Sequence, residues 1–188
     1  MRIIVLNAPP SSGKGVAQDV LARFEYATPM SFKTPLVQLT KTIYGITDQQ
    51  WDSWYQPEEK EVYRDELDSL SCREALIHVS EDIIKPNFGE DYFGKMMVKS
   101  IYNDTSSYTK TYVIDDGGFD HEIIPLMEEF GRRNLYLITI ERDGHSFVND
   151  SRNWLDKKFF HACGHITNDG DLSTFQGDVL SLYKALLH

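Results

Sequence analysis

Lys14 is the residue best suited to chemistry in this sequence, because it lies in a run of small residues near the start of the chain, Ser11-Ser-Gly-Lys-Gly15. Residues 2–6 before this run are typical of a short buried strand, and the apolar residues after it recur at helical spacing. At such a strand-to-helix turn, backbone N–H groups and the helix dipole favour an anion, and a lysine adds a point charge that reaches the outer phosphates. The pattern predicts a loop that binds the triphosphate of a nucleotide, formed by Pro10, Ser11, Ser12, Gly13, Lys14, Gly15 and Val16.

The loop departs from the common pattern G-x-x-x-x-G-K-[ST] at two of its four defined positions. Ala8 stands in place of the first glycine, and Gly15 stands in place of the hydroxyl residue. Since no hydroxyl follows Lys14, a Mg²⁺ ion bound with the nucleotide has to rely on phosphates, water and other side chains. The alternative interpretation is a glycine-rich turn in an ordinary α/β domain.

Phosphoryl transfer depends on positioning and charge neutralisation, so carboxylates and arginines are the next candidates. Asp115 and Asp116 follow the predicted strand 111–114, at the end of the sheet where parallel-sheet proteins bind ligands. One of them is a candidate to hold Mg²⁺ through water, and the other to contact the acceptor's sugar or base. Arg142 and Arg152 lie in the polar segment after the predicted strand 134–140. The alternatives are a plain acidic turn and two solvated arginines.

Lys33 and Arg73 are the candidates for binding the phosphate of an acceptor. Each has a simple alternative as a solvated charge, Lys33 on a loop and Arg73 on a helix surface. An acceptor base could stack on nearby aromatic residues, although such side chains more often belong to a core or its rim. These aromatic residues are Trp51, Trp54, Tyr55 and Tyr92.

The elements that must position these residues alternate between strands and helices. Besides the strands already named, residues 26–32 and 161–167 are predicted strands. Helices are expected from Gly13, from Pro35 with Thr34 as its cap, over 90–103, from Asp120 as the cap, and after 172. A further helix is expected from the capping box at Ser71 to about Ile84, ended by Pro86 and the turn Asn87-Phe-Gly89. A polar stretch lies at 104–110. Alternating strands and helices predict a parallel sheet of about five strands covered by helices on both faces.

The composition limits the class of protein. The 188 residues suffice for a single domain, and the net charge of −10 disfavours nucleic acid as a partner. No run of 18 apolar residues predicts a membrane span, and the N-terminus has no signal region. Cys72 and Cys163 have no zinc spacing and are interpreted as reduced thiols, which favours a cytoplasmic protein. Small-molecule nucleotides are the expected partners, a homodimer is compatible with the sequence, and the acceptor base stays open.

The loop resembles that of adenylate kinase and related nucleoside monophosphate kinases, in which Gly-Lys-Gly is normal. The order of the pieces resembles the bacteriophage deoxynucleoside monophosphate kinase family. The stretches that carry the resemblance are Asn7 to Gly15, Ser31-Phe-Lys-Thr-Pro-Leu36, Arg73 with Asp82 to Phe93, Tyr112 to Glu122 and Ile166 to Leu172. Adenylate kinase and its relatives have a threonine where Val16 stands, and the bacteriophage family has an arginine where Gly118 stands. A phosphate contact expected at Gly118 must therefore come from elsewhere.

The resemblance implies a three-layer P-loop kinase fold in one domain over 1–188, with a helical substrate-binding insertion at about 34–104. It also implies a lid-like segment at about 142–156, whose Arg142 and Arg152 close over the transferring phosphate, and it favours Asp116 over Asp115 as the functional carboxylate. The implied activity transfers the γ-phosphoryl group of ATP, with Mg²⁺, to a deoxynucleoside monophosphate in the cytoplasm, that of the host if a phage encodes the chain. Two alternatives stay open: phosphorylation of a hydroxymethylated base in DNA or another small phosphorylated alcohol, and nucleotide binding without turnover.

Overall fold

The computed structural model describes residues 1–105 and 110–187 and divides into two compact units. The first, called the sheet unit here, consists of Met1–Phe32 and Gly94–His188, and the second, the helical unit, is Lys33–Phe93. The predicted insertion at about 34–104 extends further than the helical unit, because the helix at its end belongs to the sheet unit from Gly94 on. The predicted polar stretch at 104–110 lies partly outside the described residues.

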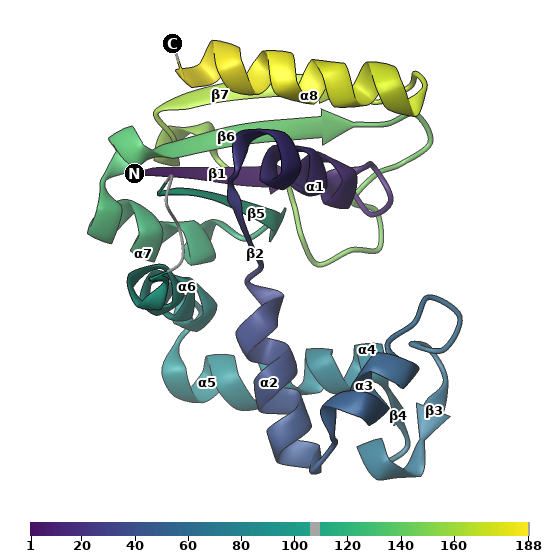
Figure 1. The fold of residues 1–188 in the computed structure, drawn as a ribbon. Coiled ribbons are helices and arrows are strands. Elements are labelled where there is room, and N and C mark those ends of the chain that lie inside the picture. Colours follow the sequence, from purple (N-terminus) through teal and green to yellow (C-terminus); the bar gives the residue numbers. More distant parts are fainter. Residues whose placement is uncertain (106–109, 188) are drawn as a thin grey trace. The chain divides into compact units, whose positions relative to one another are not determined.

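The sheet unit is built on a five-stranded parallel sheet with the strand order β2-β5-β1-β6-β7 (Figure 1). Parallel neighbours require crossover connections, which helices supply here. This arrangement confirms the predicted α/β fold with about five strands. The strands are β1 Arg2–Asn7, β2 Thr28–Met30, β5 Thr111–Gly117, β6 Leu135–Glu141 and β7 Ala162–Thr167.

Helices cover both faces of this sheet, because its strands carry apolar side chains on both faces. On one face, α1 and α8 share a buried cluster with alternate strand residues such as Ile4 and Ile138. Ile3 and Leu137 point the other way and are also fully buried, and α7 contacts β6. The helices of the sheet unit are α1 Lys14–Glu25, the part of α6 Tyr92–Asn103 from Gly94 on, α7 Asp120–Phe130 and α8 Leu172–Leu187, with short 3-10 turns at Arg132–Asn134 and Lys157–Phe159.

Gly94 sets the close approach of α6 to α7. A Cβ atom at this position would fall 2.4 Å from the carbonyl oxygen of Glu122 and 3.0 Å from Cγ of Pro125. Backbone atoms cannot give way cheaply, so Gly94→Ala should lower the free energy of unfolding by about 1–3 kcal/mol. In most helices the same substitution instead raises the free energy of unfolding, by about 0.5–1 kcal/mol.

Denaturant unfolding of both variants checks this prediction. Gly177→Ala in α8 is the matched control, because a Cβ there would meet no atom within 4 Å apart from its chain neighbours and the backbone of its own helix. We expect Gly177→Ala to keep or raise the unfolding midpoint while Gly94→Ala lowers it. Equal midpoints for the two variants would contradict the tight α6–α7 contact.

The start of α7 differs from the sequence prediction. Phe119 is the residue before the helix, and it makes no side-chain cap. Asp120, predicted to be the cap, is the first helical residue, and its carboxylate accepts a hydrogen bond from the backbone N–H of Asp156 at 2.9 Å. The prediction was wrong because a chain segment distant in sequence uses the carboxylate that would otherwise cap the helix.

The helical unit carries a small antiparallel hairpin, β3 with β4, which the sequence did not predict. Ser71 and Glu74 form the predicted capping box at the start of α4, with both reciprocal hydrogen bonds present. The elements of this unit are α2 Lys33–Tyr44, α3 Asp48–Trp54, β3 Tyr63–Arg64, the 3-10 turn Asp65–Leu67, β4 Leu70–Ser71, α4 Cys72–Ile77, the π-helix His78–Ile84 and α5 Lys85–Phe88.

Two predicted helix boundaries in this region were wrong. The helical path does not end at Pro86 but continues through the π-helix into α5, where the proline occupies the first turn and its missing N–H is tolerated. Gly89, the last residue of the predicted turn, ends it with a positive φ of 98°. Thr34 is not a cap, because α2 already begins at Lys33.

Within residues 1–105 and 110–187, no helix combines the length and apolar character that crossing a membrane requires.

Candidate functional site

The loop between β1 and α1 has the backbone of an anion-binding turn. Ser11 and Gly13 both adopt positive φ angles, 60° and 105°, and Gly13 precedes α1 without any side-chain cap. The Oγ atom of Ser12 is fully buried and finds no hydrogen-bond partner among the described residues. An uncapped helix N-terminus beside an unsatisfied hydroxyl favours a ligand with several acceptor oxygens, such as a phosphate.

Gly13 is required here for two reasons. Its φ of 105° is one that side chains rarely adopt, and a Cβ atom would lie 2.6 Å from Nδ2 of Asn168 and 3.1 Å from the Phe175 ring. The Asn168 amide in turn donates a 3.0 Å hydrogen bond to the carbonyl oxygen of Ser12. The turn after β7 thus supports the loop from its other side.

Lys14 begins α1 and folds its side chain back over its own loop. The Nζ atom donates to the carbonyl oxygens of Ala8 at 2.5 Å and Pro9 at 2.7 Å. The pKa of Lys14 is lowered from 10.5 to about 8, mainly by burial and also by the nearby Arg152 guanidinium, while Asp150, Asp115 and Asp116 oppose the shift. Keeping Lys14 charged in the free protein therefore costs free energy, and a bound anion would reduce this cost.

A polyphosphate such as ATP, when bound at this loop, should cause proton uptake at about pH 8.5, because Lys14 is then partly neutral in the free protein. Phosphate charge raises the Lys14 pKa on binding, so the ATP affinity should also fall as the pH rises above about 8. At about pH 6.5 Lys14 is already protonated and contributes no uptake. Calorimetry in buffers of different ionisation enthalpy measures the proton count, and the Lys14→Met variant should lose the uptake. Uptake that persists in the variant would assign the proton to another group.

Arg142 lies against this loop because of the sheet topology. From β1 the chain continues toward one edge of the sheet and from β6 toward the other, so the loops that follow these two adjacent strands meet at a topological switch point. The Nη1 atom of Arg142 donates a 3.1 Å hydrogen bond to the carbonyl oxygen of Ser11. This contact brings a guanidinium group to the predicted phosphate site.

Asp115 and Asp116 lie at the end of β5, within electrostatic range of Lys14. The Asp116 carboxylate accepts hydrogen bonds from Ser31 Oγ at 2.6 Å and from the Phe32 backbone N–H at 2.9 Å. Asp116 therefore already ties β5 to the chain that leaves β2. Both carboxylates offer the oxygen atoms that Mg²⁺ prefers, and the described residues contain no cluster of three or more potential metal-ligating side chains.

Arg152 takes the space above Gly118. A Cβ atom on Gly118 would lie 2.5 to 2.8 Å from the Cβ, Cγ and Cδ atoms of Arg152. Its guanidinium group forms a two-pronged ion pair with Asp150, Nε to Oδ1 at 2.9 Å and Nη2 to Oδ2 at 2.7 Å, which raises the pKa of Arg152. Arg152 therefore occupies the space that a side chain at position 118 would take.

The segment 142–156, predicted to be a lid, is firmly bonded at its second half. Asn153 donates its backbone N–H to Gly118 and accepts from the Asn7 side chain, and Leu155 is buried. The residues after Arg152 are thus bonded to the carboxyl end of β1 and to Gly118 after β5, and the lid stays a prediction.

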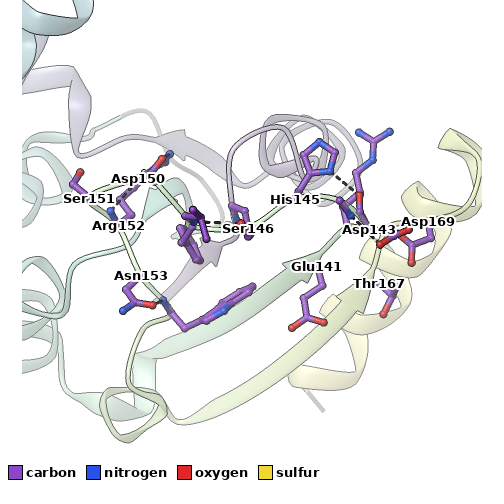
Figure 2. A pocket seen from close by; sticks show the side chains of 16 residues that line it. Glu141, Asp143, His145, Ser146, Asp150, Ser151, Arg152, Asn153, Thr167 and Asp169 are labelled. Atoms are coloured by element: carbon purple, nitrogen blue, oxygen red, sulfur yellow. Dashed lines mark hydrogen bonds and ion pairs between the residues drawn. The ribbon is translucent and has the colours of Figure 1, made fainter.

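A cavity of about 820 Å³ opens beside the loop, with Pro9 in its wall. Figure 2 shows Asp150, Arg152 and Asn153 together on one side of it and His145, Asp143 and Asp169 on the other. Phe147 and Trp154 also line it and contact each other edge to face, with ring centroids 5.1 Å apart. The cavity is large enough to admit a ligand the size of a nucleoside.

Lys33 and Arg73 belong to the helical unit and contact neighbours there. Lys33 Nζ donates to the Tyr55 hydroxyl at 3.2 Å, and Arg73 lies 3.7 Å from Glu61, with both partners about half exposed. Trp51 is buried and stacks on Tyr55 with ring centroids 5.2 Å apart, as expected for a core residue. The structure therefore brings together Lys14, Asp115, Asp116, Arg142 and Arg152, all within the sheet unit.

Sequence reasoning missed Asn7, Asp150 and Asn168 as parts of this site. Only Asn7 carried a signal, because it is a polar residue that directly follows the apolar run 3–6 in the same strand. The other two lie in polar loops, where one more polar side chain predicts nothing in particular.

The fold and the loop define the class of protein: a three-layer α/β fold of the P-loop type. No protein-family model matches the chain, and no curated protein matches it. Among solved structures, an uncharacterized protein from Eubacterium ventriosum is similar at 12% identity over 98% of each chain, with a TM-score of 0.43.

Proposed function

We propose that this chain is an ATP-dependent phosphotransferase that converts a deoxynucleoside monophosphate to the diphosphate. The observation that carries the proposal is the convergence of Lys14, Arg142 and Arg152 at the uncapped start of α1. Three cations and a set of unused backbone donors at one point match the charge of a polyphosphate in transfer. The resemblance in sequence supplies the acceptor class.

The roles of the residues follow from their places. The first-turn N–H groups of α1 bind the β- and γ-phosphates, and Lys14 exchanges its two loop carbonyls for phosphate oxygens. The cavity beside Pro9 holds the nucleoside of the donor. Arg142 and Arg152 neutralise the charge that spreads over the transferring group. Mg²⁺ supplies further neutralisation of the phosphates, and Asp115 and Asp116 are the candidates to hold it through water.

The test is ADP release from ATP and Mg²⁺ in the presence of each deoxynucleoside monophosphate in turn. We expect at least one acceptor to yield ADP and the deoxynucleoside diphosphate in equal amounts. ADP release that requires a hydroxymethylated base or another phosphorylated alcohol instead would change the acceptor class.

ATP binding that depends on Lys14 but gives no product with any acceptor would indicate a module that binds nucleotide without turnover. The sequence feature that favours this alternative is Val16, which stands in place of a metal-ligating hydroxyl. Without any Lys14-dependent ATP binding, the whole proposal fails.

A further inference from the structure

Asn7 is a fully buried amide at the end of β1, whose other buried residues are apolar. Its Nδ2 atom donates to the carbonyl oxygens of Gly117 and Asn153, each at 3.0 Å, and its Oδ1 atom accepts from the backbone N–H of Leu155 at 3.0 Å. Both N–H groups and the oxygen are thus used. A buried amide costs free energy unless it is bonded in this way, so these three contacts fix the side chain in one orientation.

The partners of Asn7 form a junction between the sheet and the segment 142–156. We call the set Asn7, Gly117, Gly118, Asn153 and Leu155 the edge junction. Asn153 is held on both sides, since its N–H donates to the Gly118 carbonyl at 3.0 Å while its own carbonyl accepts from Asn7. Leu155 is 5% exposed, and its Cδ1 atom lies 3.3 Å from where a Cβ on Gly117 would stand. The edge junction therefore leaves this part of the segment little freedom.

Arg152 is the residue immediately before the edge junction, and the position of the Arg152 side chain depends on this junction. The aliphatic stem lies on Gly118, in space that any side chain at that position would occupy. Asp150 holds the guanidinium end by its two-pronged contact. The backbone of Arg152 is thus set by the edge junction and the direction of its guanidinium by Asp150, and Figure 2 shows the three residues 150, 152 and 153 along one side of the cavity.

We infer that Asn7 is the positioning residue for Arg152: through Asn153 and Leu155 it fixes where the Arg152 guanidinium stands relative to Lys14. The inference rests on the proposed function for its catalytic consequence. Only an amide supplies two donors and an acceptor at this point, because a carboxylate would face two carbonyl oxygens and an aliphatic side chain would leave three backbone groups unpaired. A displacement of about 1 Å in a group that stabilises a transition state costs on the order of 10²-fold in rate.

A double-mutant cycle tests the coupling of Asn7 to Arg152. Asn7→Ala should lower kcat by about tenfold or more with little change in the KM for ATP, because Lys14 and the loop remain. In the Arg152→Ala background the same change should cost less than about twofold, since the group it positions is gone. An equal loss in both backgrounds would overturn the inference. Asn7→Ser, which keeps one hydroxyl, serves if the alanine variant does not fold, and is held to the same comparison.

A second readout needs no turnover. The Nε–H resonance of Arg152, assigned by its loss in Arg152→Lys, should shift or broaden in Asn7→Ala or Asn7→Ser. Gly118→Ala should disturb the same resonance from the opposite side, with Gly177→Ala as the matched control that leaves it unchanged. An unchanged resonance in the Asn7 variants overturns the positioning role. A protein without kinase activity whose resonance shifts as expected would overturn the proposed function and still support the positioning of Arg152 by Asn7.

Discussion

Lys14→Ala is expected to lower kcat by about 10²–10³-fold, equivalent to about 2.7–4 kcal/mol of transition-state stabilisation. The ammonium group is preorganised at the first residue of α1, beside the uncapped N–H groups, in a partly buried setting where charge interactions are strong. Steady-state kinetics with saturating ATP and acceptor measure the loss.

The fold should survive this change, because the Lys14 side chain contacts only the carbonyl oxygens of its own loop among the hydrogen bonds of the described residues. Thermal unfolding checks this. Lys184→Ala is the matched control, since Lys184 is also a helical lysine of the sheet unit but is exposed, with Glu25 at 3.7 Å. A Lys14→Ala variant with normal turnover and a cooperative transition would refute the kinase proposal.

Arg152→Ala is expected to lower kcat by about 10²-fold while weakening ATP binding by about tenfold or less. Asp150 fixes the guanidinium group, and the aliphatic stem of Arg152 packs on Gly118. The guanidinium is therefore preorganised to stabilise negative charge that develops only as the phosphoryl group moves. Comparing kcat with the dissociation constant of ATP separates the two effects. The exposed Arg133 provides the matched control, Arg133→Ala, which should change neither quantity.

The Arg152 variant has a side effect that a second variant removes. Without the arginine, the Asp150 carboxylate, whose side chain is 10% exposed, loses this partner and repels phosphate. The double variant Asp150→Asn with Arg152→Ala should therefore regain ATP affinity but keep the low kcat. If kcat recovers as well, the loss came from the carboxylate, and the transfer charge is neutralised by other residues.

Local chemistry made much of the fold predictable. The apolar run before the loop, the small residues around Lys14 and the spacing of α8 each depend on contacts within one element, so their strand, turn and helix were correctly expected. The capping box at Ser71 was predicted for the same reason, because both of its partners lie within four residues. The boundaries at Thr34, Pro86 and Asp120 were misplaced for reasons that lie outside the local sequence. Near Thr34 and at Asp120, residues distant in the chain form the hydrogen bonds, and before Pro86 the helix continues as a π-helix.

The sequence by itself determined a parallel α/β sheet, a loop of small residues with Lys14 after its first strand, and the cations and carboxylates near the ends of other strands. Only the tertiary structure decided how these residues are coupled. Asn7 bonds to residues 110 and 146–148 positions away, and Arg152 occupies space that Gly118 leaves free. Such contacts depend on which loops meet at the sheet edge, and this is set by the strand order rather than by any local pattern.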